Sequence, residues 1–326
     1  MSGKELVDSA KTKALKGERL SRGEIISLLS LAGEYAAYLG SAAREVAAAI
    51  TNNRYYLWGA IGLDYKPCEM NCDFCSLGKE WGLVKNEYEL PEDEVICRVR
   101  DYSLDGIRWV VLRTTEFYSI DALCALIGKV KRLVPGAYEL GLNIGEIDAS
   151  AAAKLSSAGC DFIYHSLRLG EGRQTRFEPQ IRLNTLHAVR DSAMNLVFLA
   201  EPIGTEHTNE EIADIICTVL ECKTKVSGAM ARIPVTGTPL GDTPQISDDR
   251  MAHIIAVTRL ACADIVEDIC VHPASEKAFA FGANVTVIES GAIPRDGGRW
   301  ETPWKGFTCK NAKEWFENQN YIQGEV

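Results

Sequence analysis

Short apolar runs alternate with helical patterns along most of this chain, and this alternation constrains the fold more than any other feature. The apolar runs, which we interpret as strands, cover residues 55–63, 107–112, 138–143, 162–167, 195–200, 228–233, 264–269 and 284–288. Patterns typical of helices separate them at residues 91–104, 119–134, 148–158, 179–193, 208–222, 247–262 and 274–281. Strands that alternate with crossover helices pair in parallel, and eight such repeats close a barrel. The sequence therefore predicts an α/β fold, a (β/α)8 barrel that is complete or nearly so.

The segments on either side of this repeat differ from it. Residues 1–53 read as helices, and Ser21 and Glu24 have the spacing of a capping box ahead of an apolar run. The chain from residue 291 onward is rich in Gly, Pro, Trp and charge, with one helical pattern near residues 311–317. We therefore expect a helical cap over residues 1–53, a barrel over 54–290 and a tail over 291–326 that covers one end of the barrel.

Net charge, apolar runs and cysteine content indicate the compartment and the classes of partner that we expect. The chain has 326 residues and a net charge of −10 with the charges mixed throughout, which argues against nucleic-acid binding. It contains no run of about 18 apolar residues and no apolar signal core near the N-terminus. Eleven cysteines without a secretion signal indicate a reducing compartment. The sequence therefore predicts a cytoplasmic protein with no nucleic-acid or membrane partner.

Three cysteines follow the first predicted strand within a span of eight residues: Cys68, Cys72 and Cys75. Thiolates suit iron–sulfur clusters, and gaps of three and two residues let one loop hold three corners of a single cube. A closed zinc site requires four protein ligands, and the nearest further cysteine and histidine are Cys97 and His165. The spacing favours a cluster whose fourth iron is open to a small molecule, with a closed zinc site as the alternative.

The spacing C-x3-C-x2-C, with the aromatic Phe74 before the last cysteine, resembles the signature of the radical S-adenosylmethionine enzymes. This resemblance implies that the three thiols hold a 4Fe–4S cluster and that S-adenosylmethionine binds its open iron, with Phe74 beside this cofactor. An electron from a donor such as ferredoxin or flavodoxin would then yield a 5′-deoxyadenosyl radical, which takes a hydrogen atom from a small-molecule substrate. An exposed iron further implies an anaerobic or microaerobic host.

A second stretch is similar to biotin synthase and its relatives, among them methylornithine synthase and the FeFe-hydrogenase maturase. Residues 158–161 and 163–168, Ala-Gly-Cys-Asp and Ile-Tyr-His-Ser-Leu-Arg, resemble their Ala-Gly-x-Asp and Asn-His-Asn-x-Asp segments, and further matches extend over roughly residues 20–290. The resemblance implies that Ser166 contacts the ribose of S-adenosylmethionine. Arg168 stands where biotin synthase has an aspartate, so a different substrate is implied, with Arg168 as a candidate catalytic residue.

Two further cofactor sites are implied by the resemblance. Thr115 and Glu116 follow the second predicted strand, where the family has a Gly-Gly-Glu-like segment that binds the methionine amino group. A helix N-cap is the alternative for this segment. Arg176 lies near the arginine that in relatives pairs with the methionine carboxylate, a pairing that the guanidinium geometry suits.

Two candidate catalytic residues end other predicted strands. Glu201 follows the fifth, where a buried carboxylate costs energy unless it is paired, so we expect it to contact S-adenosylmethionine or substrate. Arg232 lies at the end of the sixth and is a candidate partner for Glu201 or for an acidic substrate. His272 and Glu289 complete this ring of polar residues.

The relatives differ in whether a second cluster donates sulfur to the substrate. Biotin synthase holds that cluster with cysteines on strands two, three and five, where this chain has Leu112, Leu140 and Phe198 or their neighbours. Cys270 and Cys309 are the remaining candidates, together with His272, for another metal site. We therefore predict a rearrangement or bond cleavage in cofactor or specialised biosynthesis. Sulfur insertion of the lipoyl or biotin type is the alternative, and a non-enzymatic zinc-binding barrel is a remote one.

Overall fold

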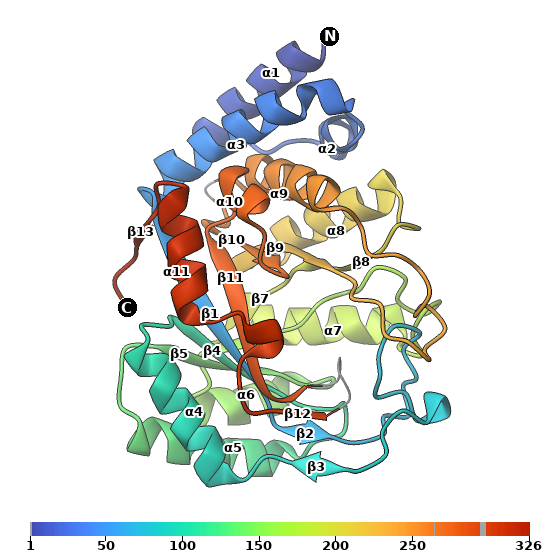
Figure 1. Cartoon of the computed structure of the whole chain (residues 1–326), viewed down its shortest axis with the longest axis vertical. Coiled ribbons are helices and arrows are strands. Elements are labelled where there is room, and N and C mark those ends of the chain that lie inside the picture. Colours follow the sequence, from blue (N-terminus) through green and yellow to red (C-terminus); the bar gives the residue numbers. More distant parts are fainter. Residues whose placement is uncertain (1, 264, 294–297) are drawn as a thin grey trace.

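A closed barrel of parallel strands forms the centre of the molecule (Figure 1) in the computed structural model, which describes residues 2–263, 265–293 and 298–326. Its strands are β1 (Arg54–Gly62), β4 (Trp109–Arg113), β5 (Glu139–Asn143), β6 (Phe162–Tyr164), β7 (Asn195–Val197), β8 (Ala200–Ile203), β9 (Val226–Ala231), β10 (Asp268–His272) and β11 (Val285–Ile293). β7 and β8 share one position in the barrel, since both pair with β9. β1 pairs with β4 on one side and with β11 on the other, so the ring closes. The predicted (β/α)8 barrel is confirmed.

Helices connect successive strands on the outside of this ring. They are α4 (Glu92–Leu104), α5 (Ile120–Leu133), α6 (Ala149–Ser157), α7 (Pro179–Arg190), α8 (Asn209–Glu221), α9 (Asp248–Cys262) and α10 (Glu276–Ala280). Most begin at a residue whose side chain accepts a hydrogen bond from a first-turn amide: Ser119, Asp148, Thr208, Ser247 and Ser275. The polar residues that precede each apolar pattern thus place the helix starts close to where the sequence predicts them.

Three further helices precede the barrel: α1 (Gly3–Leu15), α2 (Arg22–Leu29) and α3 (Ala36–Thr51). The capping box expected from Ser21 and Glu24 is present at the start of α2. α1 and α3 pack on each other and on α9. Figure 1 shows them at the opposite end of the molecule from the small sheet formed by β2 (Asp64–Tyr65) and β3 (Tyr88–Glu89). Among the described residues no single helix could cross a membrane, and one pair, α2 with the segment Gly33–Thr51, meets the length and composition test despite a 99° bend.

One predicted strand lies further along the chain in the structure. The strand expected at residues 264–269 lies at 268–272, and the expected first residue, Asp264, falls outside the described residues. Ile265 and Val266 are apolar because they pack against the core at a turn, and not because they belong to a strand. The apolar character of a residue reports burial, which a turn can also provide.

The tail is more ordered than the predicted loop. β11 continues to Ile293, and β12 (Gly298–Trp300) pairs with it antiparallel, while residues 294–297 of the expected tail lie outside the described residues. The expected last helix is confirmed as α11 (Cys309–Asn318), which follows the short helix η3 (Trp304–Gly306). β13 (Ile322–Gln323) then pairs with the start of β1.

The core has two layers, because side chains alternate between the two faces of each strand. Trp58, Trp109, Phe162, Tyr164 and Cys270 belong to the cluster that fills the barrel. Leu112, Leu140 and Phe198 belong to the outer cluster between strands and helices. These three positions, which we had compared with the ligands of a sulfur-donating cluster, therefore do not face the interior. The nearest interior residues on these strands, such as Val111 and Leu199, are not cysteines either.

Candidate active site

The loop that carries the three cysteines is fixed by backbone hydrogen bonds. The amide of Cys68 donates to the carbonyl of Leu77 at 2.7 Å, and the amide of Cys75 donates to the carbonyl of Cys72 at 2.9 Å. Asn71 adopts a left-handed conformation at φ 40°, and its side chain accepts from the amide of Glu80 at 2.8 Å. Asparagine tolerates this conformation better than most residues. The short gaps between the cysteines thus fold into a tight turn.

The three thiols share one environment at the edge of the barrel. Cys72 is buried, and burial raises the pKa of its thiol to about 12, while the charge of Arg168 acts in the opposite direction. Nη1 of Arg168 lies 3.6 Å from Sγ of Cys72. Burial also raises the pKa of Cys68, and its thiol senses the charge of Cys75. A buried thiolate requires positive charge nearby, which a metal cluster supplies together with Arg168.

The loop offers thiols as its metal-binding groups, and these suit a cluster. Among the described residues, no three His, Cys, Asp or Glu side chains lie close enough together to ligate one metal ion. The thiols that hold a cube bind three different irons and so stand farther apart than ligands of one zinc. Three thiols on one loop are the donor set that three corners of an iron–sulfur cube require, whereas a closed zinc site has no ligand set among the described residues.

A cavity of about 240 Å³ opens beside this loop at the carboxyl ends of the strands. Cys72, Phe74 and Cys75 line it from the loop. Its charged and polar walls are Asp64, Arg113, Asn143, Arg168, Arg182, Glu201, Arg232, His272 and Glu289. Its floor includes the apolar residues Trp58, Leu199 and Val287. This placement is where barrel enzymes carry their active sites.

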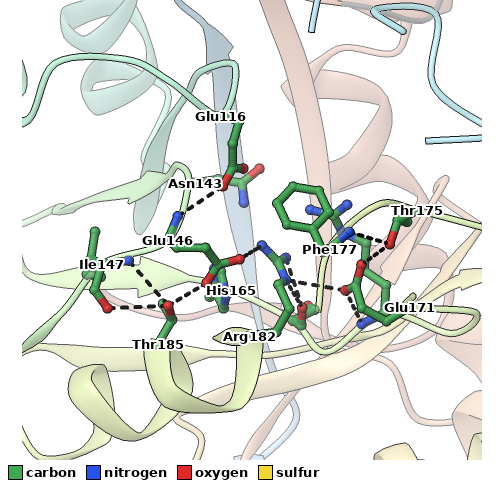
Figure 2. Close-up of polar contacts among 12 residues, drawn as sticks. Glu116, Asn143, Glu146, Ile147, His165, Glu171, Thr175, Phe177, Arg182 and Thr185 are labelled. Atoms are coloured by element: carbon green, nitrogen blue, oxygen red, sulfur yellow. Dashed lines mark hydrogen bonds and ion pairs between the residues drawn. The ribbon is translucent and has the colours of Figure 1, made fainter. Parts of the chain in front are cut away.

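Arg182, on α7, organises the polar network drawn in Figure 2. Its Nη1 donates to Oε1 of Glu146 at 2.6 Å, its Nη2 to the carbonyl of Ser166 at 3.0 Å, and its Nε lies 3.3 Å from Glu171. The residue is 2% exposed, so its charge is neutralised by these carboxylates within the protein. His165 lies 3.3 Å from Glu146, and burial lowers the pKa of His165 to about 4.

The segment after β4 forms hydrogen bonds with β2 and with the segment that follows β5. The amide of Thr115 donates to Oδ1 of Asp64 at 2.8 Å, and its hydroxyl donates to the same carboxylate. Glu116 accepts from the amide of Glu146 at 3.2 Å (Figure 2), and burial raises the pKa of Glu116 to about 7. The helix that follows is capped by Ser119, so neither Thr115 nor Glu116 serves as its N-cap.

The candidate catalytic residues line the cavity but do not pair with one another as expected. Glu201 accepts a hydrogen bond from the hydroxyl of Tyr164, and burial keeps the pKa of Tyr164 well above its usual value. Arg232 is paired with Glu206, at 2.9 Å between Nη2 and Oε2, rather than with Glu201. The reason is that Glu206, in the loop after β8, reaches back over Arg232.

Two predicted cofactor residues lie in different settings. Ser166 is buried beneath the cavity wall, where its hydroxyl accepts from the amide of Leu199 at 3.4 Å. Arg176 lies outside the residues that line the cavity, with a half-exposed side chain paired to Glu80. The arginines of this region that line the cavity are Arg168 and Arg182.

Sequence reasoning missed Arg182, Glu146 and Glu171 as a unit. Arg182 falls on the apolar face of α7, beside the buried Leu186, and a charged residue at such a position signals a buried pair. Sequence reasoning also missed the ion pair of Arg113 with Glu289. Oε2 of Glu289 lies 3.3 Å from Nε2 of His272. Arg113 is the last residue of β4, and a charged end to an apolar strand is the available signal.

Cys270 and Cys309 are not brought together. Cys270 is fully buried in the cluster inside the barrel, and burial raises its pKa. Cys309 belongs to the outer cluster at the start of α11, close to Asp105. His272 lies two residues beyond Cys270 on β10 and lines the cavity. The possible second metal site is therefore not assembled from these three residues.

Comparisons with known proteins place these features in a family context. No family model matches the chain. A biotin synthase from a Sulfurihydrogenibium species is 23% identical over 265 residues, which cover 78% of this chain and 79% of that protein. A biotin synthase from a Caulobacter species is 28% identical over 211 residues, covering 60% and 61% of the two chains.

Solved structures share the fold. The crystal structure of methylornithine synthase (PylB) matches with a TM-score of 0.79 and 19% identity, and the match covers 97% of each chain. The FeFe-hydrogenase maturase HydG from Carboxydothermus hydrogenoformans matches with a TM-score of 0.81 and 16% identity, over 98% of this chain and 80% of that one. At these identities the likeness concerns the barrel and its added segments.

Proposed function

We propose that the chain is an enzyme of the radical S-adenosylmethionine superfamily, in its biotin-synthase-like subfamily, and that it reductively cleaves S-adenosylmethionine to take a hydrogen atom from a small-molecule substrate. Enzymes of this superfamily bind a 4Fe–4S cluster and S-adenosylmethionine. The observation that carries the proposal is the position of Cys68, Cys72 and Cys75 on a tight loop, with two of them lining the 240 Å³ cavity. When bound, these groups supply the electron transfer and the radical that side chains cannot.

The chain's own residues bind and orient the reactants. Phe74 lines the cavity beside the cysteines and offers a flat apolar surface to S-adenosylmethionine. Glu116 is not among the residues that line the cavity, but it accepts from the amide of Glu146 and can offer a carboxylate to an ammonium group. Arg182, which lines the cavity, can offer a guanidinium to a carboxylate. Arg182 is better placed for that contact than Arg176, because it lines the cavity. Ser166 supports this wall from below.

The substrate would occupy the inner part of the cavity. Tyr164 stays protonated, and its hydroxyl donates a hydrogen bond to Glu201. This pair therefore presents an oriented carboxylate, and the hydroxyl of Tyr164 is already engaged. Arg113 and Glu289 form a second oriented pair across the cavity. Trp58 and Leu199 form an apolar floor that excludes water from a reactive intermediate. The polar pairs fix the orientation of the substrate.

We further propose that the reaction is a rearrangement or bond cleavage and not sulfur insertion. A sulfur-donating cluster needs several ligands on the barrel wall within reach of the substrate. Among the described residues Cys270 is the sole cysteine in the interior cluster. Cys309, the other candidate, packs outside the barrel. This arrangement supports the proposal, although the curated relatives above are named biotin synthases.

The test is anaerobic reconstitution of the full chain with iron and sulfide, followed by reduction with dithionite in the presence of S-adenosylmethionine. We expect 5′-deoxyadenosine as a product, and we expect Cys72→Ala to abolish it. The matched control is Cys97→Ala, because Cys97 is exposed on α4 and far from the loop in sequence. Stoichiometric zinc in place of iron, with no 5′-deoxyadenosine on reduction, would contradict the proposal.

A further inference from the structure

Glu201 differs from the other charged residues of the cavity wall in its partners. Arg182 and Arg232, on the same wall, each form ion pairs with carboxylates. The carboxylate of Glu201 accepts a hydrogen bond from the hydroxyl of Tyr164, but among the side chains that the structure describes no lysine, arginine or histidine forms an ion pair with it. Glu201 is only 7% exposed, and burying a charge without a partner costs free energy. Glu201 is therefore a buried acid without a cationic partner in the described part of the chain.

The nearest candidate for that partner within the chain is directed elsewhere. Arg168 lies close enough to Glu201 for their charges to interact. However, its Nη1 lies 3.6 Å from Sγ of Cys72, and its guanidinium lies over the ring of Phe177 at 4.9 Å. Arg168 thus faces the cysteine loop, and the carboxylate of Glu201 is left for a group that enters the cavity.

The backbone fixes the position of Glu201. β8 pairs with β9 at Ala200 with Ala229 and at Ile203 with Ala231, so three residue steps on β8 lie opposite two steps on β9. One extra residue of this kind is a β-bulge, a feature that redirects side chains next to active sites. Glu201 lies within this irregular stretch and lines the cavity. The strand therefore presents its carboxylate to the cavity.

The surroundings of this carboxylate suit a positively charged group. The rings of Tyr164 and Trp58 meet edge to face at 5.1 Å, and both residues line the cavity together with Glu201. Aromatic rings attract cations, and a carboxylate does so more strongly. A carboxylate offers about four lone-pair sites, and the hydroxyl of Tyr164 uses one of them. Glu201 can therefore accept further hydrogen bonds from an ammonium group.

We propose that Glu201 binds a positively charged nitrogen of the substrate, so that the enzyme acts on a small molecule that carries a protonated amine. This inference rests on the proposed function, because it takes the cavity beside the cysteine loop as the place of reaction. The amine lies at the wall that β8 forms, while S-adenosylmethionine lies beside the loop. An ion pair at a fixed point of the wall orients the rest of the substrate toward the cysteines. Glu201 is thus a residue that determines specificity.

The probe for this test is butan-1-amine, which is protonated at pH 7, with butan-1-ol and butanoate for comparison at equal ionic strength. Binding to the reconstituted full chain, without reductant, is measured as the rise in the midpoint of thermal unfolding with ligand concentration. We expect the amine alone of the three to raise the midpoint. Glu201→Gln should weaken binding of the amine at least tenfold, because a charge-assisted hydrogen bond is lost.

Asp64→Asn is the matched control for binding. Asp64 also lines the cavity, but its carboxylate already accepts hydrogen bonds from the amide and the hydroxyl of Thr115. That variant should bind the amine as wild type does. Saturating S-adenosylmethionine should leave amine binding in place. Competition between the two, or equal amine binding by wild type and Glu201→Gln, overturns the inference.

A second measurement needs no ligand. Because a buried charge without a partner destabilises the fold, Glu201→Gln should raise the midpoint of thermal unfolding by about 2 °C. Glu206→Gln, which breaks the ion pair with Arg232, should lower it. A lower midpoint in Glu201→Gln would show that the chain itself stabilises this charge and would also overturn the inference. Neither measurement involves reduction, so failure of amine binding is distinct from failure to form 5′-deoxyadenosine.

Discussion

Nη1 of Arg168 lies 3.6 Å from Sγ of Cys72, so a cation stands against one of the three thiols that we propose hold the cluster. The guanidinium also lies over the ring of Phe177 at 4.9 Å, and the backbone amide of Arg168 donates to Glu171 at 3.1 Å. These contacts hold the side chain toward the loop. Arg168 therefore acts on the cysteine loop at least as directly as on a substrate.

The first prediction concerns the reduction potential of the cluster. A positive charge and a hydrogen bond near a cluster sulfur favour the reduced state, so their loss should lower the potential. We expect Arg168→Gln to lower the midpoint by on the order of 60 mV, a tenfold change for a one-electron couple. Arg168→Lys should lower it less. The measurement is a redox titration followed by electron paramagnetic resonance.

Arg176→Gln is the control for this titration, since Arg176 is paired with Glu80 away from the cavity. It should leave the midpoint unchanged. A midpoint in Arg168→Gln equal to that of wild type would show that the contact with Cys72 does not influence the cluster.

The second prediction separates the two arginines as partners of the methionine carboxylate. Arg182 is buried at the cavity wall, whereas Arg176 is half exposed. Arg182→Lys should weaken S-adenosylmethionine binding about tenfold or more, because lysine cannot form the forked contact. Arg176→Lys should have no effect. The measurement is the affinity for S-adenosylmethionine, determined by equilibrium dialysis on cluster-loaded protein. Weaker binding in Arg176→Lys together with unchanged binding in Arg182→Lys would identify Arg176 as the partner of the methionine carboxylate.

The third prediction concerns stability and pH. Burial alone would raise the pKa of Glu146, but its contacts with His165 and Arg182 lower it to about 2. A lowered pKa stabilises the fold above the unfolded value of about 4.5, and this stability is lost as the pH falls toward 2. At pH 7 His165 is uncharged and Arg182 is the charged partner that remains, so we expect Glu146→Gln to reduce the free energy of unfolding by about 2 kcal/mol. The difference from wild type should shrink between pH 4.5 and pH 2.

Urea denaturation at a series of pH values measures this difference. Asp121→Asn is the matched control, because Asp121 is 85% exposed and its pair with Lys154, at 3.4 Å, lies on the surface. That variant should stay within about 0.5 kcal/mol of wild type at every pH. A Glu146→Gln deficit that is the same at pH 3 and pH 7 would argue against the charge of Glu146 as its cause.

The fold could be predicted from the sequence because its periodicity is local. Most of the helices that follow the apolar runs begin at a capping residue of their own, such as Ser119, whereas α4 and α7 do not. Local signals of this kind survive in the structure. The cysteine loop could be predicted for the same reason, since its ligands lie within eight residues.

The partners of the site residues could not be predicted, because they come from distant segments. Arg232 pairs with Glu206 and not with Glu201, although both glutamates lie in the same stretch of chain. Arg182 meets Glu146 and Glu171 through the packing of α7, which no local pattern reports. Which face of a strand points inward also depends on register, so Leu112 and Leu140 face outward although the strands themselves were identified.

The last prediction is that the chain holds one cluster and does not insert sulfur. A donor cluster must lie within reach of the substrate radical, and of the cysteines that the structure describes, Cys270 alone packs in the barrel interior. Reconstituted protein should therefore contain about four iron and four sulfide ions per chain, the content of one cube. Cys270→Ser should keep that content, whereas Cys72→Ala should lose it. About twice as much iron and sulfide, with the excess lost in Cys270→Ser, would instead favour thiolation of the lipoyl or biotin type.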